Sequence, residues 1–311
     1  MPEIAEVRLI ADNIYGFLNG TSIVKIEILH PDIIPKYIKR NLKGISEFNS
    51  YISNNPIKFL NLYTKGKFCW IQLEYNWLVL ITFGMSGNVR IEPTPDYLQQ
   101  YNKNMSKKGS KTIDRDNYLK HCHLKIIYKN DNGDTNHFYY HDIRRFGSWT
   151  FTNELQLLNN KLDKLGHDPL NESKLPDKQL IELFRKFNSG NICKILMSQK
   201  LITGVGNYIV SEVLYSSKIC PLSLIKDIPD ENILILYDSI RKIALDAYKG
   251  GGASLYTFTG MDGDCTEFKN ELKVYKRKTD PLGNKVIRIP DKESPDKRSK
   301  FWVKEVQTIG N

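Results

Sequence analysis

The chain begins with residue types that could carry amine chemistry, a proline at position 2 followed by Glu3 and Glu6. Removal of the initiator methionine, which a small second residue favours, would leave Pro2 with a free secondary amine. Such an amine attacks an aldehyde carbon and gives a positively charged iminium, which then acts as an electron sink. An α-amino group titrates near neutral pH, and a helix N-terminus disfavours its charged form, so neutral amine should be available. Either carboxylate lies close enough in sequence to exchange protons with the reacting groups.

The same residues also suit a plain helix start, in which Glu6 is a solvated surface residue. Proline and acidic residues are favoured in the first turn of a helix. Apolar residues follow at helical spacing and predict a helix that ends near Gly20: Ile4, Val7, Ile10, Ile14 and Phe17.

A second unusual stretch is GVGNYIVSE, residues 204–212. Gly204 and Gly206 allow a tight reversal of the chain and leave no side chain to keep an anion away from the backbone. The N–H groups at the start of the following helix would point at that anion, and the Asn207 side chain would add a donor. A glycine turn with Asn207 as N-cap is the alternative interpretation.

The elements that must position these residues fall into two regions. From Thr21 to about Thr152 short β-branched and aromatic runs alternate with turn signals, which predicts the antiparallel hairpins of a β-sandwich or barrel. Residues 153–176 mix proline, glycine and polar residues and look like a connector, and the segments after them are helical by period. We therefore expect an α+β protein with domains 1–152 and 177–311 and the linker 153–176.

Composition and charge limit the class of protein. The 311 residues are 41% hydrophobic and 26% charged, as in an ordinary globular protein. No run approaches the ~18 apolar residues of a membrane span, and the first residues are acidic where a signal peptide is basic, so we expect an intracellular protein with no membrane partner. The net charge of +10 favours a polyanionic partner such as nucleic acid, although the lysine content of an AT-rich genome explains part of it.

Cysteine and histidine do not form a metal-binding pattern. The five cysteines stand singly without a CxxC pair, which fits a reducing compartment and argues against a thiolate zinc site. His121 and His123 would lie on one face of a strand, but no third ligand stands at a useful spacing. We expect no metal and no cofactor.

Seven stretches follow one another in a distinctive order: MPEIAEVR, GKFCWIQL, FGMSGNVRI, HDIRRFGSW, KLGHDPL, LMSQKLITGVGNYIVSEVLYSSKICPL and GGASLYTF…FKNELKVYKRKTDPLG. Over nearly the whole chain this order resembles the Fpg/Nei family of DNA glycosylases. In detail it is similar to the Nei-like branch, which contains endonuclease VIII and its eukaryotic relatives. The resemblance implies an N-terminal helix with an antiparallel β-sandwich, then a helical domain with a helix-two-turn-helix motif and a β-hairpin finger.

The resemblance also implies catalytic roles. Pro2 matches the family's N-terminal nucleophile, which displaces the damaged base at the anomeric carbon of the sugar and forms the iminium. Glu3 matches its acid/base partner, and Glu6 a further acidic position. Lys67 matches a strand lysine that contacts the phosphate beside the lesion, with an ordinary exposed strand lysine as the alternative. Asn207 matches the asparagine of the helix-two-turn-helix motif that binds phosphate.

Three further residues match the side chains that the family inserts into the base stack after the lesion is flipped out: Met85, Arg144 and Phe146. A thioether, a guanidinium and a ring suit that role because each can lie flat against bases. Arg145 is close enough to exchange roles with Arg144, and a core position remains the alternative for Phe146.

The chain departs from the family at the C-terminal zinc finger, which the family builds from two CxxC pairs. The four thiolate positions hold residues that cannot bind zinc: Leu282, Lys285, Val303 and Val306. We expect a zincless finger, a hairpin over about 272–308 in which apolar packing replaces the metal. Arg298 then matches the finger arginine that binds phosphate, with Arg288 as the alternative if the register is shifted.

The activity implied by the resemblance is that of a bifunctional DNA glycosylase and AP lyase of base excision repair. It would excise oxidised pyrimidines and formamidopyrimidines through a Schiff base on Pro2 and cleave the strand by β,δ-elimination. Damaged double-stranded DNA is the expected partner, with single-stranded DNA as an alternative, and we expect a monomer wherever DNA is held, in cytoplasm or nucleus. A loop near Tyr256 to Phe268 would cover the flipped base. The competing hypothesis is a non-enzymatic DNA-binding protein on the same scaffold, which a retained initiator methionine would favour.

Overall fold

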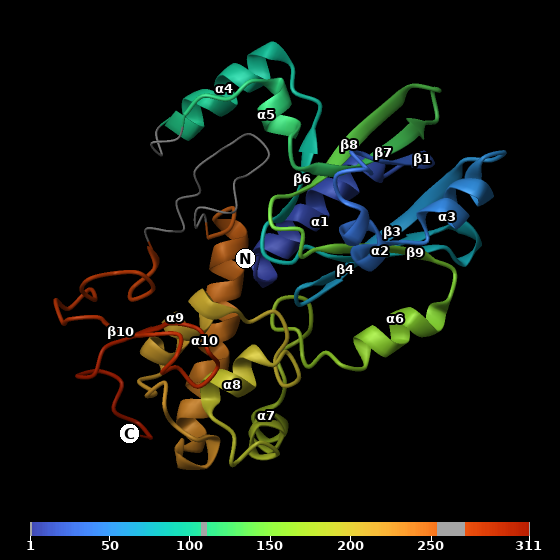
Figure 1. The fold of residues 1–311 in the computed structure, drawn as a ribbon. Coiled ribbons are helices and arrows are strands. Elements are labelled where there is room, and N and C mark those ends of the chain that lie inside the picture. Colours follow the sequence, from blue (N-terminus) through green and yellow to red (C-terminus); the bar gives the residue numbers. More distant parts are fainter. Residues whose placement is uncertain (1, 107–110, 254–270, 311) are drawn as a thin grey trace. The chain divides into compact units, whose positions relative to one another are not determined.

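The computed structural model describes residues 2–106, 111–253 and 271–310 (Figure 1). The chain divides into two compact units. The N-terminal unit contains Pro2, residues 6–160 and residues 251–253, and the C-terminal unit contains Glu3–Ala5, Lys161–Gly250 and the residues from 271 onward. The chain therefore crosses from one unit to the other within its first six residues. The segment near Tyr256 to Phe268, which we expected to cover a flipped base, lies outside the described residues.

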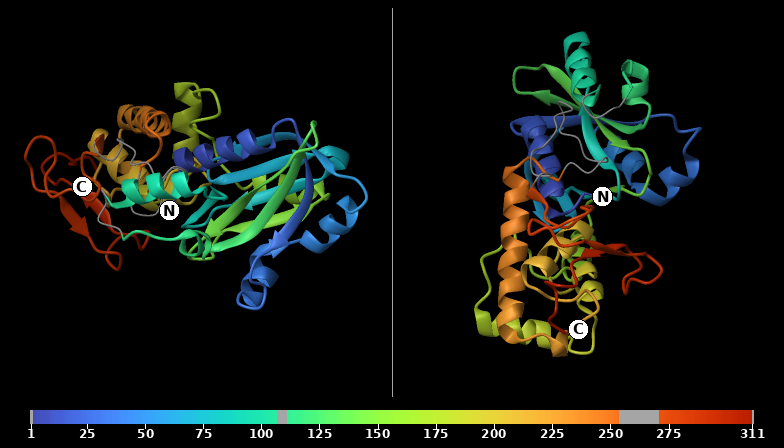
Figure 2. Two further views of the ribbon diagram at one scale, coloured as in Figure 1. Left: turned by 90° about the horizontal axis from the view of Figure 1, so that it is seen from above. Right: turned by 90° about the vertical axis from the view of Figure 1, so that its left-hand side faces the viewer.

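The N-terminal unit is built on a sheet of nine described strands in the order β2-β9-β5-β4-β3-β1-β7-β8-β6. Neighbouring strands are antiparallel, except that β2 and β9 are parallel over two residue pairs. β1 pairs with β3 only at Ser22 and Ile23. Only these two residue pairs join the two parts of the sheet, and the two parts form the two layers visible in Figure 2. The elements of this unit are α1 (Ile4–Leu18), β1 (Thr21–Ile28), α2 (Pro35–Asn41), β2 (Leu42–Lys43), α3 (Ile45–Ile52), β3 (Ile57–Lys65), β4 (Phe68–Leu73), β5 (Leu78–Thr82), β6 (Gly87–Ile91), α4 (Pro95–Ser106), α5 (Arg115–Leu119), β7 (Cys122–Asn130), β8 (Thr135–Asp142), β9 (Ser148–Thr152) and α6 (Leu155–Leu162).

One hydrophobic core fills this unit. The apolar stripe of α1, with Val7, Ile10 and Ile14, contributes to it together with the inward-facing residues of both layers, such as Ile71 on β4 and Leu124 on β7. Alternation along the strands explains this arrangement, because every second side chain points to the same face. The predicted N-terminal helix and antiparallel sandwich are confirmed.

The C-terminal unit is mainly helical, and α10 is its longest described helix (Figure 1). A two-stranded hairpin, β10 with β11, follows the helices, with Arg288 opposite Phe301. No helix within the described ranges is long and apolar enough to cross a membrane. The elements of this unit are α7 (Asp177–Arg185), α8 (Ile192–Met197), α9 (Asn207–Ser216), α10 (Asp230–Lys249), β10 (Ile287–Ile289) and β11 (Lys300–Trp302).

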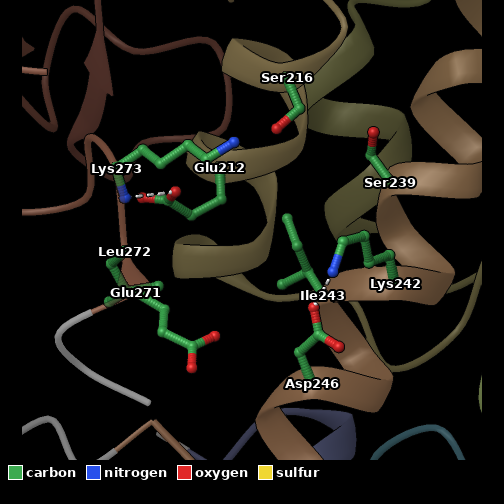
Figure 3. A pocket seen from close by; sticks show the side chains of 9 residues that line it. All are labelled: Glu212, Ser216, Ser239, Lys242, Ile243, Asp246, Glu271, Leu272 and Lys273. Atoms are coloured by element: carbon green, nitrogen blue, oxygen red, sulfur yellow. Dashed lines mark hydrogen bonds and ion pairs between the residues drawn. The ribbon is translucent and has the colours of Figure 1, made fainter. Parts of the chain in front are cut away.

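Glu212, on α9, fastens the chain segment that leads into the hairpin. Its carboxylate accepts the backbone N–H groups of Lys273, Val274 and Tyr275 at 2.8, 2.9 and 2.7 Å. Burial raises the pKa of Glu212, while the three N–H groups oppose the rise. The contact borders a hollow of about 280 Å³ between α9, α10 and this segment (Figure 3). Glu212 therefore holds the start of the hairpin region against the helices.

Candidate active site

The first residues of the chain are fixed against the turn that precedes α9. Pro2 and Glu3 are buried and directly precede α1. The N–H of Ile4 donates to the carbonyl oxygen of Gly204 at 3.1 Å. Pro2, the residue with the candidate amine, therefore stands two positions before Ile4, which is hydrogen-bonded to this turn.

Glu3 caps the start of α9. Its Oε1 accepts the N–H of Tyr208 at 3.1 Å and its Oε2 accepts the N–H of Ile209 at 3.4 Å, and only 3% of the residue is exposed. A carboxylate at a helix N-terminus satisfies donors that have no partner within the helix, and the helix dipole stabilises its negative charge. The prediction that these N–H groups bind an external anion is therefore wrong for Tyr208 and Ile209.

The two glycines before α9 make room for the first residues of the chain. A Cβ on Gly206 would lie 2.1 Å from Cδ of Glu3, and a Cβ on Gly204 would lie 2.6 Å from Cβ of Ile4. Gly204 also has a φ of +87°, which favours glycine. Asn207 is the first residue of α9 and Gly206 takes the N-cap position, so the N-cap interpretation of Asn207 is also wrong.

The Asn207 side chain joins α9 to the hairpin. Its Nδ2 donates to the carbonyl oxygen of Ser299 at 3.0 Å, and its Oδ1 accepts Nζ of Lys300 at 2.6 Å. Lys300 is fully buried and also donates to Asp296 at 2.6 Å. The amide is thus held in one orientation, and the Tyr275 side chain is a further hydrogen-bond partner of Asn207.

Asn207 borders a polar hollow of about 410 Å³ that also contains both candidate finger arginines. Arg288 donates to Oγ of Ser299 at 2.8 Å and lies 3.9 Å from Asp291. Arg298 is exposed and makes no side-chain hydrogen bond or ion pair within the described part of the chain. Of the two arginines, Arg298 is the one with its guanidinium available to an anion.

In the N-terminal unit Lys67 lies in the turn between β3 and β4, and not within a strand as predicted. The preceding residue, Gly66, has a φ of +59°, which closes this turn. Lys67 is half-buried. A turn places an ammonium at the end of the sheet, where a ligand can approach it more easily than on a strand.

The three residues expected to enter the base stack lie on two adjoining turns. Met85 follows β5, and Arg144 and Phe146 follow β8. A Cβ on Gly84 would lie 2.8 Å from Cβ of Phe146, so the two turns are in close contact. The Arg144 guanidinium lies 5.2 Å from the centre of the Phe146 ring, and Phe146 is 53% exposed. The alternative that Phe146 is a core residue is therefore wrong.

Asp142, which the sequence analysis missed, holds these two turns together. It is fully buried. Its carboxylate accepts the hydroxyl of Ser86 at 2.5 Å, the N–H of Gly147 at 2.8 Å and the N–H of Arg144 at 3.2 Å. The sequence signal was an aspartate between a strand and an RRFG turn, a place where carboxylates often bind backbone N–H groups.

Glu6 points into the N-terminal unit and is not a solvated surface residue. It is 1% exposed, and its Oε1 accepts the N–H of Ala253 at 2.7 Å. Ala253 is the last described residue before the segment that was expected to cover the flipped base. Glu6 thus anchors the beginning of that segment to α1.

The two histidines around Cys122 have separate environments. His123 is buried, and one ring nitrogen lies 2.8 Å from the carbonyl oxygen of Asp142. His121 borders a surface hollow. Within the described residues no group of three or more His, Cys, Asp or Glu side chains is arranged to hold a metal ion.

The finger hairpin forms without thiolates. Val303 is buried in a small cluster with Tyr215, Val274 and Val286, and Val306 packs against it. Leu282 and Lys285, the other two positions at which we expected apolar packing, do not take part in this cluster. Leu282 is 76% exposed, and Lys285 is also exposed. The expected apolar packing thus involves only two of the four positions, Val303 and Val306.

Asp280 organises the other end of the hairpin. Its carboxylate accepts the N–H groups of Leu282 and Asn284 at 2.9 and 2.8 Å and the hydroxyl of Tyr215 at 3.0 Å. Lost hydration would raise the pKa of Asp280, but the hydrogen bonds from Asn284 and Tyr215 outweigh it and lower the pKa. One carboxylate therefore fixes the tight turn that contains Leu282.

Gln199 explains how the chain reverses twice between α8 and α9. Its side-chain oxygen accepts the N–H of Gly204 at 2.8 Å, and its amide nitrogen donates to the carbonyl oxygen of Val205 at 2.8 Å. Gln199 itself has a φ of 65°. The helix, two turns and a second helix are thereby tied into one motif.

Comparisons with known proteins agree with this arrangement. The family model described as formamidopyrimidine-DNA glycosylase N-terminal domain matches residues 1–149, and the one described as formamidopyrimidine-DNA glycosylase H2TH domain matches residues 165–259. The formamidopyrimidine-DNA glycosylase of Mycoplasma mobile is 30% identical over 285 residues, which cover 91% of each chain. The chain belongs to the Fpg/Nei family. Another member, from Lactobacillus helveticus, is 25% identical over 90% of each chain.

Solved structures of Fpg/Nei proteins share the fold. Lactococcus lactis Fpg in complex with DNA containing an abasic site superposes with a TM-score of 0.75 at 23% identity and covers 98% of this chain and 99% of its own. MutM in complex with DNA containing carbocyclic 8-oxo-G gives a TM-score of 0.75 at 22% identity, with 99% and 100% covered. The predicted α+β fold, with a helical C-terminal region and a terminal hairpin, is that of the family.

Proposed function

We propose that the chain is a bifunctional DNA glycosylase and AP lyase of base excision repair, with Pro2 as nucleophile. The observation that carries this proposal is the position of Glu3, the residue after Pro2, whose carboxylate is fixed on the N-terminus of α9. The relatives named above as formamidopyrimidine-DNA glycosylases, which match over about 90% of the chain, support the same activity.

The chemistry follows from a secondary amine next to a fixed carboxylate. The Pro2 nitrogen attacks C1′ of the damaged nucleotide, and the bond from C1′ to the base breaks with its electron pair on the base, which leaves protonated. The nitrogen, now bonded to C1′, loses its proton, and its lone pair forms the iminium as the C1′–O4′ bond breaks and O4′ takes a proton. Each Glu3 oxygen has lone pairs beyond those that accept N–H groups, so the carboxylate can carry these protons.

Strand cleavage uses the iminium as an electron sink. Loss of a proton from C2′ expels the 3′ phosphate, and loss of a proton from C4′ then expels the 5′ phosphate. Water finally hydrolyses the imine and frees Pro2. Lys67, Asn207 and Arg298 would hold phosphates on the damaged strand during these steps, because each presents an N–H donor that can reach an anion.

Met85, Arg144 and Phe146 would fill the space that a flipped nucleotide vacates. Flipping costs a few kcal/mol, and a side chain that stacks in the gap recovers part of that cost. Their position on two adjoining turns, with Phe146 exposed and Arg144 over its ring, supports this role.

We also propose that the chain is of the Nei-like type with a zincless finger and that it prefers oxidised pyrimidines and formamidopyrimidines. The supporting observation is the replacement of two thiolates by the Asp280 turn and of two by the Val303 cluster. Purified protein should contain no zinc, and a chelator should leave its melting temperature unchanged.

Borohydride reduction in the presence of lesion-containing DNA tests the central step. Protein that lacks the initiator methionine by intact mass should be trapped covalently on the DNA, and Pro2→Gly should lose most of the adduct. A panel of single-lesion oligonucleotides, duplex and single-stranded, would give the substrate range and the ends left by cleavage. If protein with a free Pro2 gives no adduct on any lesion, the chain acts as a DNA-binding protein without this chemistry.

A further inference from the structure

The hollow that His121 borders, of about 540 Å³, lies within the N-terminal unit on the outer face of the layer formed by β1, β7, β8 and β6. The insertion that carries α5 forms one wall, and the loop after β1 forms another. Its volume is in the range of small-molecule sites. Its lining comes from residues 27–33 and 115–121, from β7 and β8 and from the turn after β8, and it includes Leu29, Ile33, Lys120, Lys125, Tyr139 and Arg145.

Positive charge dominates this hollow. Lys120, Lys125 and Arg145 have no carboxylate within ion-pair distance among the described residues. The two acids that line it are already engaged, since Glu27 pairs with Lys25 at 2.9 Å and Asp116 lies 3.6 Å from Arg115. Glu27 also stands directly opposite Lys125 on the neighbouring strand. The basic side chains of the lining, Arg115, Lys120, Lys125 and Arg145, nevertheless outnumber these two carboxylates, so the hollow keeps a net positive charge, which favours an anionic ligand.

The hollow also has an apolar and aromatic side. Leu29 and Ile33 lie on the loop after β1, and Ile33 is 69% exposed although it is a large apolar residue. Tyr139 contributes a ring whose hydroxyl donates to Glu92 at 2.5 Å, so that the ring is fixed in place. Tyr139 is only 5% exposed and forms part of the floor, so a planar, partly apolar group would be covered mainly by Leu29 and Ile33.

Arg145 connects the hollow to the exposed turn after β8. It lies between Arg144 and Phe146, whose side chains face each other at 5.2 Å. Its φ of 57° is unusual for a residue with a side chain and turns Arg145 away from its two neighbours into the lining of the hollow. A strand held by Arg144 and Phe146 would therefore have this hollow directly beside it.

We propose that this hollow is a nucleotide-binding pocket, in which Lys120, Lys125 and Arg145 bind the phosphate and Leu29 and Ile33 cover the base. The chemistry suits a nucleotide of the undamaged DNA strand and also a free mononucleotide. The position of Arg145 favours the DNA strand, and that choice of source rests on the function proposed above.

Photo-cross-linking of the full chain tests the pocket. The two probes are 5-iodo-dUMP and a lesion duplex with one 5-iodouracil in the undamaged strand, and cross-linked peptides are mapped by mass spectrometry. We expect adducts on the peptides that contain Leu29 or Ile33. Lys125→Glu should reduce their yield at least about tenfold. Lys129→Glu is the matched control, because Lys129 is exposed on the same face of β7 four residues further along and does not line the hollow; it should leave the yield unchanged.

Each outcome decides a part of the proposal. Adducts from the duplex alone assign the pocket to a DNA strand, and adducts from 5-iodo-dUMP that depend on Lys125 assign it to a free nucleotide. The proposal is overturned if neither probe labels these peptides and calorimetry detects no Lys125-dependent binding of dTMP. It is equally overturned if Lys125→Glu and Lys129→Glu behave alike. Borohydride trapping reports the Pro2 reaction alone, so a chain that is trapped but not labelled would refute the pocket and leave the proposed function standing.

Discussion

The ammonium of Lys300 lies 2.6 Å from Oδ1 of Asn207, inside the unit and without exposure to solvent. The same ammonium lies 2.6 Å from Asp296. A buried lysine is stable only with such partners, because transfer of an unpaired charge out of water is costly. Lys300 therefore fixes which side of the Asn207 amide faces the hollow, and it brings a positive charge beneath the proposed phosphate site.

Lys300→Met should lower both stability and DNA affinity. Asp296 would lose its partner in a site that is nearly closed to solvent, and breaking such a pair costs on the order of 3 kcal/mol. The Asn207 amide would also be free to rotate, so we expect binding to weaken about tenfold, or 1.4 kcal/mol. Urea unfolding and fluorescence anisotropy measure the two effects.

The double variant Lys300→Met/Asp296→Asn separates the two effects. It removes the unpaired charge of Asp296, so stability should recover. The affinity for DNA should stay low, as we also expect for Asn207→Ala. Asn159→Ala, at an exposed position on α6, is the control for Asn207→Ala and should bind normally. Recovery of full affinity in the double variant would show that Lys300 acts only on stability.

Asp142→Asn should impair excision from duplex DNA more than from single strands. The amide cannot accept all of the donors that the carboxylate accepts from Ser86, Arg144 and Gly147. The two turns should loosen, with a stability loss of about 1–3 kcal/mol. Only in a duplex does the flipped nucleotide leave a gap opposite an intact base, so kcat/KM should fall mainly on duplex DNA. Asp131→Asn, in the exposed loop between β7 and β8, is the control, and an equal loss on both substrates would argue against a gap-filling role.

The sequence allowed the prediction of those features that depend on residue type and local spacing. The N-terminal helix and the hairpins of the first region follow from periodicity and turn residues, and the amine chemistry follows from Pro2 itself. The hairpin finger was expected from the resemblance to the family. The reason for Gly206 could not be predicted, because its neighbour is Glu3, about two hundred residues away in sequence. The same holds for Lys300, whose partner Asn207 is 93 residues away. A lysine in a polar segment gives no local sign that it will be buried.

Glu212 predicts a specific dependence of stability on pH. Burial raises its pKa above the ordinary 4.5, so the unfolded chain releases this proton at lower pH than the folded chain does. The contribution of Glu212 to the free energy of unfolding is therefore fully present below about pH 4.5 and is lost as pH rises through the raised pKa. Urea unfolding from pH 4 to 8, with Glu212→Gln for comparison, should show the difference between wild type and variant falling with pH and then levelling. A difference that grows with pH would contradict the raised pKa.

Gly206→Ala should separate catalysis from phosphate binding. The new Cβ would lie 2.1 Å from Cδ of Glu3, so the carboxylate must leave the N–H groups of Tyr208 and Ile209. We expect the rate of borohydride trapping to fall at least about tenfold, with a smaller loss of affinity for DNA, because Asn207 keeps its contacts to Ser299 and Lys300. Gly16→Ala is the control, since a Cβ there meets nothing within 4 Å and alanine should stabilise α1 by about 0.5–1 kcal/mol. If Gly206→Ala is trapped as fast as Gly16→Ala, the position of the Glu3 carboxylate does not limit the reaction, and Glu3 is better described as a helix cap than as the acid/base partner of Pro2.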